Sequence, residues 1–136
     1  MENTRYQQGL EKLMEYTLSG DDNISTHLKI SEDLRDIAPD VGKYIIEFAY
    51  GDIYSREGLT NKQRALVTIS SLVTQGTEPQ VELHINTGLT AGLTPKEIVE
   101  SIMQLIPYTG FPRVLNALTI AKKVFAQRNV TNETSE

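Results

Sequence analysis

The sequence predicts an all-α protein, and three observations lead to that class. Apolar residues recur at the three- and four-residue spacing of amphipathic helices, and no segment shows the strict apolar–polar alternation of a half-buried strand. Three Thr-x-x-Glu/Gln sequences, a pattern typical of helix starts, occur between residues 60 and 97. Glycines and prolines lie beside these starts, where they delimit helices instead of interrupting them.

The first half of the chain is expected to form three helices. The first covers residues 3–18 and is closed by the sequence SGDDN; its apolar face is formed by Tyr6, Leu10, Leu13, Met14 and Thr17. The second runs from about Ser25 to Ile37, because a helix normally stops before a proline such as Pro39. The third runs from about Asp40 to Tyr50, and the GDIYSREG that follows is interpreted as a loop. The apolar side of this third helix is formed by Val41, Tyr44, Ile45 and Phe48.

The second half contains three further helix starts, at Thr60, Thr77 and Thr94. In each, the Thr hydroxyl can accept a hydrogen bond from the third helical amide, and the Gln or Glu at that position can return one to the Thr amide. Gly76 and Gly92 precede the next start and suit helix ends. A last helix is expected from about Pro112 to Arg128, followed by a disordered tail over residues 129–136. Its apolar side is formed by Val114, Leu115, Leu118, Ala121, Val124 and Phe125.

Charged residues are missing from three long stretches of the second half. None occurs between Arg64 and Glu78, between Glu82 and Lys96, or between Glu100 and Arg113. The helix after Thr60 has one apolar face, formed by Ala65, Leu66, Ile69, Leu72 and Val73. It also has a second, polar but mostly uncharged stripe, formed by Arg64, Thr68, Ser71 and Gln75. A neutral second face suits a subunit interface or a pocket wall, so we expect a homo-oligomer. A central core helix in a monomer would explain only the apolar face.

Size and composition limit the classes of function. With 136 residues the chain is expected to be a single domain, residues 1–136. A net charge of −5 and a pI of about 5.1 disfavour binding to nucleic acid or to an anionic membrane. The sequence has no membrane-spanning apolar run and no secretory signal, so a cytoplasmic location is expected. Because it has no cysteine, disulfides, thiol nucleophiles and thiolate metal sites are excluded.

His84 is the candidate functional residue. In the helix after Thr77, the core-facing arc is formed by Val81, Ile85 and Leu89, and His84 falls at its edge, between Gln80 and Gly88. Gly88 and the nearby Ala91 have little side-chain volume, which leaves room for a ligand or for close approach of another helix. Glu82 points to the opposite side, so a charged partner for His84 must come from elsewhere. The alternative is that His84 is a packing residue without catalytic function.

The sequence gives no indication of a metal or cofactor. Metal-binding pairs on a helix need a spacing of three or four residues, and neither His27 nor Glu82 stands at that spacing from His84. The GxGxxG, P-loop, GxSxG and HExxH patterns are all missing from the sequence. The expected partners are therefore a small-molecule substrate and other copies of the chain.

Residues 59–118 resemble the carboxymuconolactone decarboxylase family of the alkylhydroperoxidase D-like superfamily. The resemblance rests on the order and spacing of Arg64, His84, the sequence GLTPKEI that begins at Gly92, and PYTGFP, which contains Tyr108. It implies an all-helical subunit with a central helical hairpin that assembles into trimers or hexamers. That assembly agrees with the charge-depleted helices.

The family has two chemical branches. One resembles alkylhydroperoxidase D, a disulfide reductase that uses a C-x-x-C pair and a glutamate; this chain has Thr77 and Gln80 at the cysteine positions and Ala65 at the glutamate position. That activity is excluded here, because it requires a thiolate. The other branch is the decarboxylase itself, which removes CO₂ from 4-carboxymuconolactone to give an enol-lactone without cofactor or metal.

The resemblance and this chemistry together suggest roles for the site residues. His84, with an ordinary pKa near 6.5, would deliver a proton to carbon as CO₂ leaves. Arg64 would bind a substrate carboxylate in a bidentate manner, with Arg113 as a second candidate. Gln80, Gly88 and Tyr108 complete the expected substrate-binding set, while Tyr50 and Tyr54 either close the pocket or belong to the core.

Two departures from the family pattern leave an alternative open. The decarboxylases tend to have an acidic residue at the position of Gln80 and a small residue at that of Arg113. We therefore expect an altered substrate. The alternative is a ligand-binding or assembly protein that kept the scaffold and lost catalysis, and it is favoured by the missing acidic residue at Gln80 and the missing family cysteines.

Overall fold

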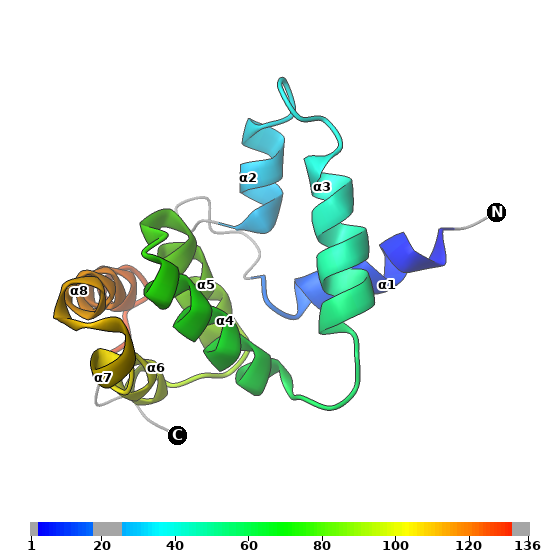
Figure 1. Ribbon diagram of the computed structural model, residues 1–136. Helices are drawn as coiled ribbons and strands as arrows, with labels where there is room; N and C mark the ends of the chain where they lie inside the picture. The colour runs from blue at the N-terminus through cyan, green and yellow to red at the C-terminus, as the bar shows by residue number, and fades with distance from the viewer. Residues whose placement is uncertain (1–2, 18–25, 132–136) are drawn as a thin grey trace.

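The computed structural model describes residues 3–17 and 26–131, and within them it is all-helical, as predicted. Figure 1 shows two groups of helices: α1, α2 and α3 with its continuation η1 form one, and α4 to α8 form the other. The elements are α1 (Thr4–Met14), α2 (His27–Asp33), α3 (Val41–Tyr44), the π-helix η1 (Ile45–Tyr54), α4 (Asn61–Gln75), α5 (Glu78–Thr90), α6 (Pro95–Met103), α7 (Ile106–Thr109) and α8 (Phe111–Gln127). The expected SGDDN helix stop lies outside the described residues.

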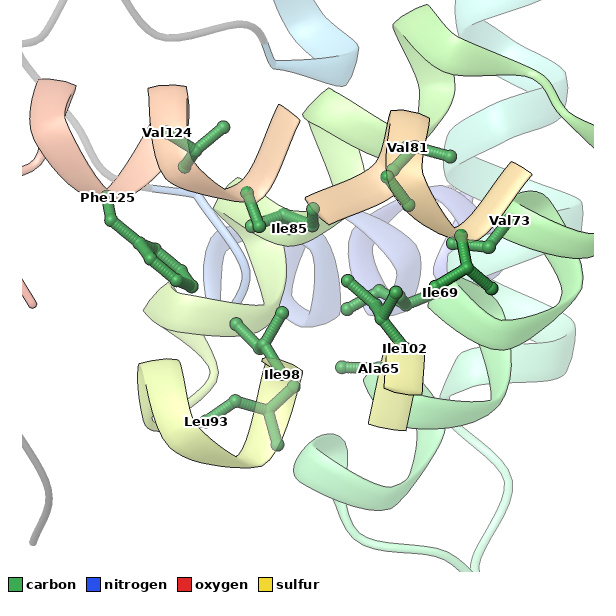
Figure 2. Packing of buried hydrophobic residues seen from close by; sticks show 13 residues of the cluster. Ala65, Ile69, Val73, Val81, Ile85, Leu93, Ile98, Ile102, Val124 and Phe125 are labelled. Carbon is green, nitrogen blue, oxygen red and sulfur yellow. The ribbon is translucent and has the colours of Figure 1, made fainter. Parts of the chain in front are cut away.

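The larger hydrophobic core lies among α4, α5, α6 and α8 (Figure 2). Its fully buried side chains include Ile69 of α4, Ile85 of α5, Ile98 of α6 and Val124 of α8. Each such side chain contributes roughly 1.5–3 kcal/mol of burial free energy. Gly76 ends α4 in the left-handed conformation, with φ of 79°, and lets the chain turn directly into α5. The predicted helical hairpin therefore consists of α4 and α5.

A smaller core joins α1 to η1. It is formed by Leu13, Tyr16, Ile46 and Tyr50. The two helices cross in backbone contact at Gly9, where an added Cβ would lie 1.8 Å from the carbonyl oxygen of Ile46. This contact fixes the π-helix, and with it Tyr50, against α1.

The third predicted helix differs from the structure in extent and in buried face. It continues as η1 to Tyr54, so the GDIY segment that we interpreted as loop is helical. The residues buried in η1 include Ile46 and Tyr50, whereas Tyr44 and Phe48 are 63% and 58% exposed. A π-helix bonds residue i to i+5 and turns less per residue than an α-helix. The α-helical periodicity therefore placed Tyr44 and Phe48 on the wrong face, whereas Ile45 packs against the smaller core as predicted.

Two of the three predicted capping boxes are formed. Thr60 accepts from the amide of Gln63 and Thr94 from that of Glu97, and both return bonds are present. The Thr77 box was wrong. The Thr77 hydroxyl instead donates to the carbonyl of Leu72 at 3.3 Å, because Thr77 directly follows the left-handed Gly76 and its side chain turns back to the end of α4.

The C-terminal segment is ordered further than predicted. The amide of Val130 donates to the carbonyl of Phe125 at 3.0 Å, and its side chain packs against the larger core. Residues 132–136, the rest of the expected tail, lie outside the described residues. Leu115 was assigned to the apolar side of the last helix but is 55% exposed. Among residues 3–17 and 26–131, no helix has both the length and the apolar character needed to cross a bilayer.

Candidate functional site

His84 lies on α5 and is buried, with 8% of its surface exposed. Its closest aromatic neighbour is the chain's other histidine. The His27 and His84 rings meet edge to face, with centroids 5.0 Å apart and planes inclined by 67°. His27 is the first residue of α2, so the N-terminal group of helices contributes directly to the surroundings of His84.

His84 belongs to an aromatic cluster, which we define as Tyr16, His27, Tyr50, Tyr54 and His84. Tyr50 is central: its ring centroid lies 5.3 Å from that of His27, 4.3 Å from that of Tyr54 and 5.8 Å from that of Tyr16. Inclined ring contacts of this kind are favourable because the edge of one ring meets the face of the next. The cluster joins the end of α1 to α2, η1 and α5.

Polar atoms of the cluster lie within hydrogen-bond distance of a partner. The Tyr50 hydroxyl lies 3.2 Å from Nδ1 of His27, and the Tyr54 hydroxyl lies 3.0 Å from Oγ1 of Thr68. On α5, Oγ1 of Thr87 lies 3.4 Å from Nδ1 of His84 and donates to the His84 carbonyl at 3.2 Å. Buried polar groups require such partners, and these bonds fix the rings as well as satisfying them.

Burial keeps both imidazoles neutral. Desolvation, with a smaller effect from His27, lowers the pKa of His84 to about 3, and desolvation lowers the pKa of His27 to about 4. Burial likewise raises the pKa of Tyr50 far above its usual value. The expected proton donor with a pKa near 6.5 is therefore not found in the subunit: His84 is uncharged at neutral pH.

Arg64 borders the same cluster from α4. Its Nη2 donates to the carbonyl of Arg56 at 2.5 Å, while its Nε is buried without a partner. Burial raises the pKa of Tyr16, and the positive charge of Arg64 lowers it by a smaller amount. The Tyr16 hydroxyl donates to the carbonyl of Asn61 at 3.3 Å, three residues before Arg64. Arg64 thus lies toward the Tyr16 end of the cluster, whereas His84 lies at the His27 end, and the Nε of Arg64 is an unsatisfied donor.

Of the two uses expected for the room beside Gly88, the structure shows the close approach of another helix, α4. A Cβ added at Gly88 would lie 3.0 Å from Cδ1 of Leu93 and 3.3 Å from Cδ1 of Ile69, so this glycine allows close packing inside the subunit. Ala91 packs against the smaller core. Gln80 is half-buried on α5, one turn before His84.

Tyr108 and Arg113 lie at a different place, the C-terminal end of α4. Nη1 of Arg113 donates to the carbonyl of Thr74 at 3.0 Å, and Thr109, next to Tyr108, bonds Thr74 through their hydroxyls at 2.9 Å. Tyr108 is 79% exposed. Arg64 and Thr74 are separated by about 15 Å along the α4 axis, at 1.5 Å per residue. One subunit therefore does not bring Arg64 and Arg113 to the same small molecule.

Two of the cavities among the described residues lie away from the aromatic cluster. One of about 440 Å³ is lined by α6 and α8 residues, among them Leu118 and Phe125. Another of about 350 Å³ lies among α1, α2 and α3, lined by Tyr6 and Lys43 among others. Neither is lined by His84 or Arg64. Within the described residues, no group of three or more His, Asp or Glu side chains is placed to hold a metal ion.

A known protein family matches the part of the chain that forms α3 to α7 and most of α8. The sequence model of the carboxymuconolactone decarboxylase family matches residues 39–123, from just before α3 into α8. The chain belongs to the carboxymuconolactone decarboxylase family. The matched range contains His84, Arg64, Tyr50 and Tyr54. His27 lies outside it, and sequence reasoning missed His27 because nothing in its spacing connects it with His84.

Comparison with individual proteins gives three relatives of this chain. The 4-carboxymuconolactone decarboxylase of Acinetobacter baylyi is 33% identical over 129 residues, which cover 95% of this chain and 92% of that protein. A 15.0 kDa protein encoded in the nqo9-nqo10 intergenic region of Paracoccus denitrificans is 36% identical over 95 residues, covering 68% of this chain and 71% of that protein. The nitrosuccinic acid decarboxylase npaB of Metarhizium robertsii is 32% identical over 79 residues, covering 58% and 55% respectively.

Proposed function

We propose that this protein is a decarboxylase that acts, without a cofactor, on a small organic acid carrying more than one carboxylate. The observation that carries the proposal is the 33% identity with a 4-carboxymuconolactone decarboxylase over 95% of the chain. A second relative has a different acid, nitrosuccinic acid, in its name. Both acids carry an oxygen-rich electron-withdrawing group, a lactone carbonyl or a nitro group, that can hold the electron pair left by CO₂.

The reaction requires one bond to break and one proton to arrive. In a carboxylated unsaturated lactone, the bond between ring carbon and carboxylate breaks, CO₂ leaves, and the electron pair passes into the conjugated carbonyl as an enolate. One proton added to carbon then gives the enol-lactone, so the net change is uptake of one proton and loss of one CO₂. The protein must therefore anchor the retained carboxylate and supply a proton.

Arg64 is the proposed anchor. A guanidinium binds a carboxylate through two parallel hydrogen bonds, and the Nε of Arg64 has no partner. The backbone bond from Nη2 to Arg56 leaves the guanidinium held at the start of α4, beside the aromatic cluster. In this proposal, that fixed positive charge holds the retained carboxylate of the substrate.

His84 is the proposed proton-transfer group, and its imidazole must first be protonated when the substrate binds. In the ligand-free subunit the pKa of His84 is lowered to about 3, so the imidazole is neutral at pH 7. A dianionic substrate placed beside it favours the charged form and raises that pKa. In this proposal His84 takes up a proton when the acid binds and transfers it to carbon as CO₂ leaves.

The other residues predicted to bind the substrate have separate roles in this proposal. Gln80 is a proposed substrate contact, since it lies one turn before His84 on α5. Tyr108 and Arg113 lie at the other end of α4, and we propose that they meet a substrate only across a contact with a second subunit. Gly88 contributes close packing behind the site instead of open space.

One observation favours a second candidate, a ligand-binding protein without catalytic activity. His84 is only 8% exposed and packs against another ring, which is also the environment of a packing histidine. In that case the protein would bind the acid through Arg64 and release it unchanged.

The test is decarboxylation of 4-carboxymuconolactone and of nitrosuccinate by the purified protein, followed by substrate absorbance and CO₂ release. We expect His84→Ala to lower kcat by about 10²–10⁴-fold, the usual contribution of a positioned acid. Arg64→Ala should mainly raise KM. Lys123→Ala is the matched control, because it removes an exposed cation that pairs with Glu82 on α5.

Either of two results would contradict the proposal. Unchanged turnover in His84→Ala would remove His84 from the reaction. No turnover of either acid by the correctly folded wild-type protein, together with binding measured by calorimetry, would support the ligand-binding candidate.

A further inference from the structure

The backbone of His27 is held in place by local structure. Thr26 caps α2, its hydroxyl accepting from the amide of Lys29 at 3.0 Å, and His27 is the first residue of that helix. The imidazole extends from this capped end to meet both Tyr50 of η1 and His84 of α5. His27 is thus the side chain through which α2 contacts the proposed catalytic group.

The Tyr50 hydroxyl lies beside one nitrogen of His27. Tyr50 is 1% exposed, and its hydroxyl oxygen is 3.2 Å from Nδ1 of His27, within hydrogen-bond distance. A neutral imidazole has one donor and one acceptor nitrogen. We expect the phenol to donate to Nδ1, which leaves the hydrogen of His27 on Nε2.

The Thr87 hydroxyl lies beside the other ring. Its oxygen is 3.2 Å from the carbonyl oxygen of His84 and 3.4 Å from Nδ1 of His84. We expect its hydrogen to go to the carbonyl and its oxygen to accept from Nδ1, which leaves the lone pair of His84 on Nε2. Nε2 is then the nitrogen that would take up and transfer a proton.

We propose that His27 is a positioning residue for His84: its ring, held by the Tyr50 hydroxyl, fixes the His84 imidazole in one orientation with Nε2 available for proton transfer. The proposal rests on the proposed function, because the orientation of His84 serves catalysis only if His84 transfers a proton. The orientation itself is a property of the ligand-free protein. His27 touches no reacting atom in this arrangement and acts through His84.

A substrate-free experiment tests the geometry. Long-range ¹H–¹⁵N spectra of ¹⁵N-histidine-labelled protein at neutral pH report the tautomer of each ring, and the chain has only two histidines to assign. We expect the Nε2–H form for His27 and the Nδ1–H form for His84. Tyr50→Phe, which keeps the ring and removes the hydroxyl, should give mixed tautomers for His27 and shift the His84 signals.

The control is Tyr44→Phe, which removes the hydroxyl of an exposed tyrosine and should change neither spectrum. If the His84 signals are the same in wild type, Tyr50→Phe and His27→Ala, the positioning role is wrong. The same conclusion follows if wild-type His84 shows a mixture of tautomers.

Kinetics separate positioning from simple packing. With folding verified by circular dichroism, we expect His27→Ala to lower kcat by up to about 100-fold, the effect of misplacing a catalytic group by about 1 Å. KM should change by less than about twofold, since substrate contacts remain. His27→Phe should recover much of the lost kcat, because it restores the ring against His84.

A normal kcat in folded His27→Ala, or an increase in KM alone, would overturn the proposal. Failure of the proposed function would look different: the wild-type protein would turn over neither acid. The tautomers in the ligand-free spectra would still decide whether His27 orients His84.

Discussion

At the scale of single residues, the buried imidazole of His84 and the half-buried imidazole of His27 make the stability of the subunit depend on pH. The pKa of His84 is lowered to about 3 and that of His27 to about 4, from an ordinary value of 6.5. Below pH 6.5 the unfolded chain therefore binds more protons than the folded one. The stabilisation is fully present above pH 6.5 and is lost as the pH falls toward 4 and then 3.

We predict that the free energy of unfolding decreases between pH 6.5 and 5, by up to about 1.4 kcal/mol per pH unit for each histidine. Urea titrations at intervals of half a pH unit measure this slope. The carboxyls of Glu15, Asp52 and Glu97 have lowered pKa values and titrate below this window, so they contribute little to it.

The matched variant for this measurement is His27→Phe, which keeps an aromatic ring at the position and cannot bind a proton. Its slope between pH 6.5 and 5 should be about half that of the wild type. An identical slope in the two proteins would show that His27 is not buried in its neutral form.

The candidate site shows which properties of its residues could be predicted from the sequence. His84 belongs to the aromatic cluster and Arg64 lies toward its Tyr16 end; both were selected from the sequence, and their roles stay predictions. The lowered pKa of His84 could not be predicted, because it depends on desolvation by residues from α2, η1 and α5. A pKa is a property of the assembled environment, and no spacing within α5 contains that information.

At the scale of elements, the crossing of α1 and η1 depends on a residue without a side chain. Gly9 is buried, and an added Cβ would lie 1.8 Å from the carbonyl oxygen of Ile46 and 3.0 Å from the amide nitrogen of Gly51. Both neighbours are backbone atoms, so the helices would have to separate. The same movement would displace Tyr50 from His27.

We predict that Gly9→Ala destabilises the protein by about 1–3 kcal/mol, the usual cost of overpacking. In an exposed helix the same change would stabilise by up to about 1 kcal/mol through helix propensity, so the sign of the effect is informative. Chemical denaturation measures it. Gln8→Ala, at the exposed neighbouring position, is the control and should remain within about 0.5 kcal/mol of the wild type.

A stabilised Gly9→Ala protein would mean that α1 does not cross η1 in backbone contact. Loss of His27 order in Gly9→Ala, seen in the same histidine spectra, would connect this crossing to the site.

Sequence patterns predicted the helix starts well where the two hydrogen-bonding groups are close in the sequence. The capping boxes of Thr60 and Thr94 involve groups three residues apart, and both formed. The buried face of η1 could not be predicted, since the π-helical winding follows from the contact with α1. The capping box predicted at Thr77 did not form for a related reason, because the turn at Gly76 changed the partner of the Thr77 hydroxyl.

At the scale of the whole molecule, large apolar side chains remain exposed on both groups of helices. Those that are at least 55% exposed are Ile37, Tyr44, Phe48, Val67, Tyr108, Phe111 and Leu115. Val67 lies on α4, whose predicted polar stripe carries no charge after Arg64. Exposed apolar residues on a face without charge are typical of protein–protein interfaces.

We therefore predict that the protein in solution is a homo-oligomer, with a mass three or six times the 15.2 kDa of the subunit. Sedimentation equilibrium at micromolar concentration measures this mass. Val67→Glu should dissociate the assembly, because burying an unpaired carboxylate at an interface costs several kcal/mol. Glu11→Lys, on the exposed surface of α1, changes the charge by twice as much and should leave the mass unchanged.

The assembly also bears on the reaction, since Tyr108 and Arg113 lie at the opposite end of α4 from Arg64. If a second subunit supplies them to the site, dissociated Val67→Glu should lose substrate affinity while its histidine spectra remain those of the wild type. If the wild-type protein sediments at 15.2 kDa, the neutral face of α4 has another purpose and each subunit must bind its substrate alone.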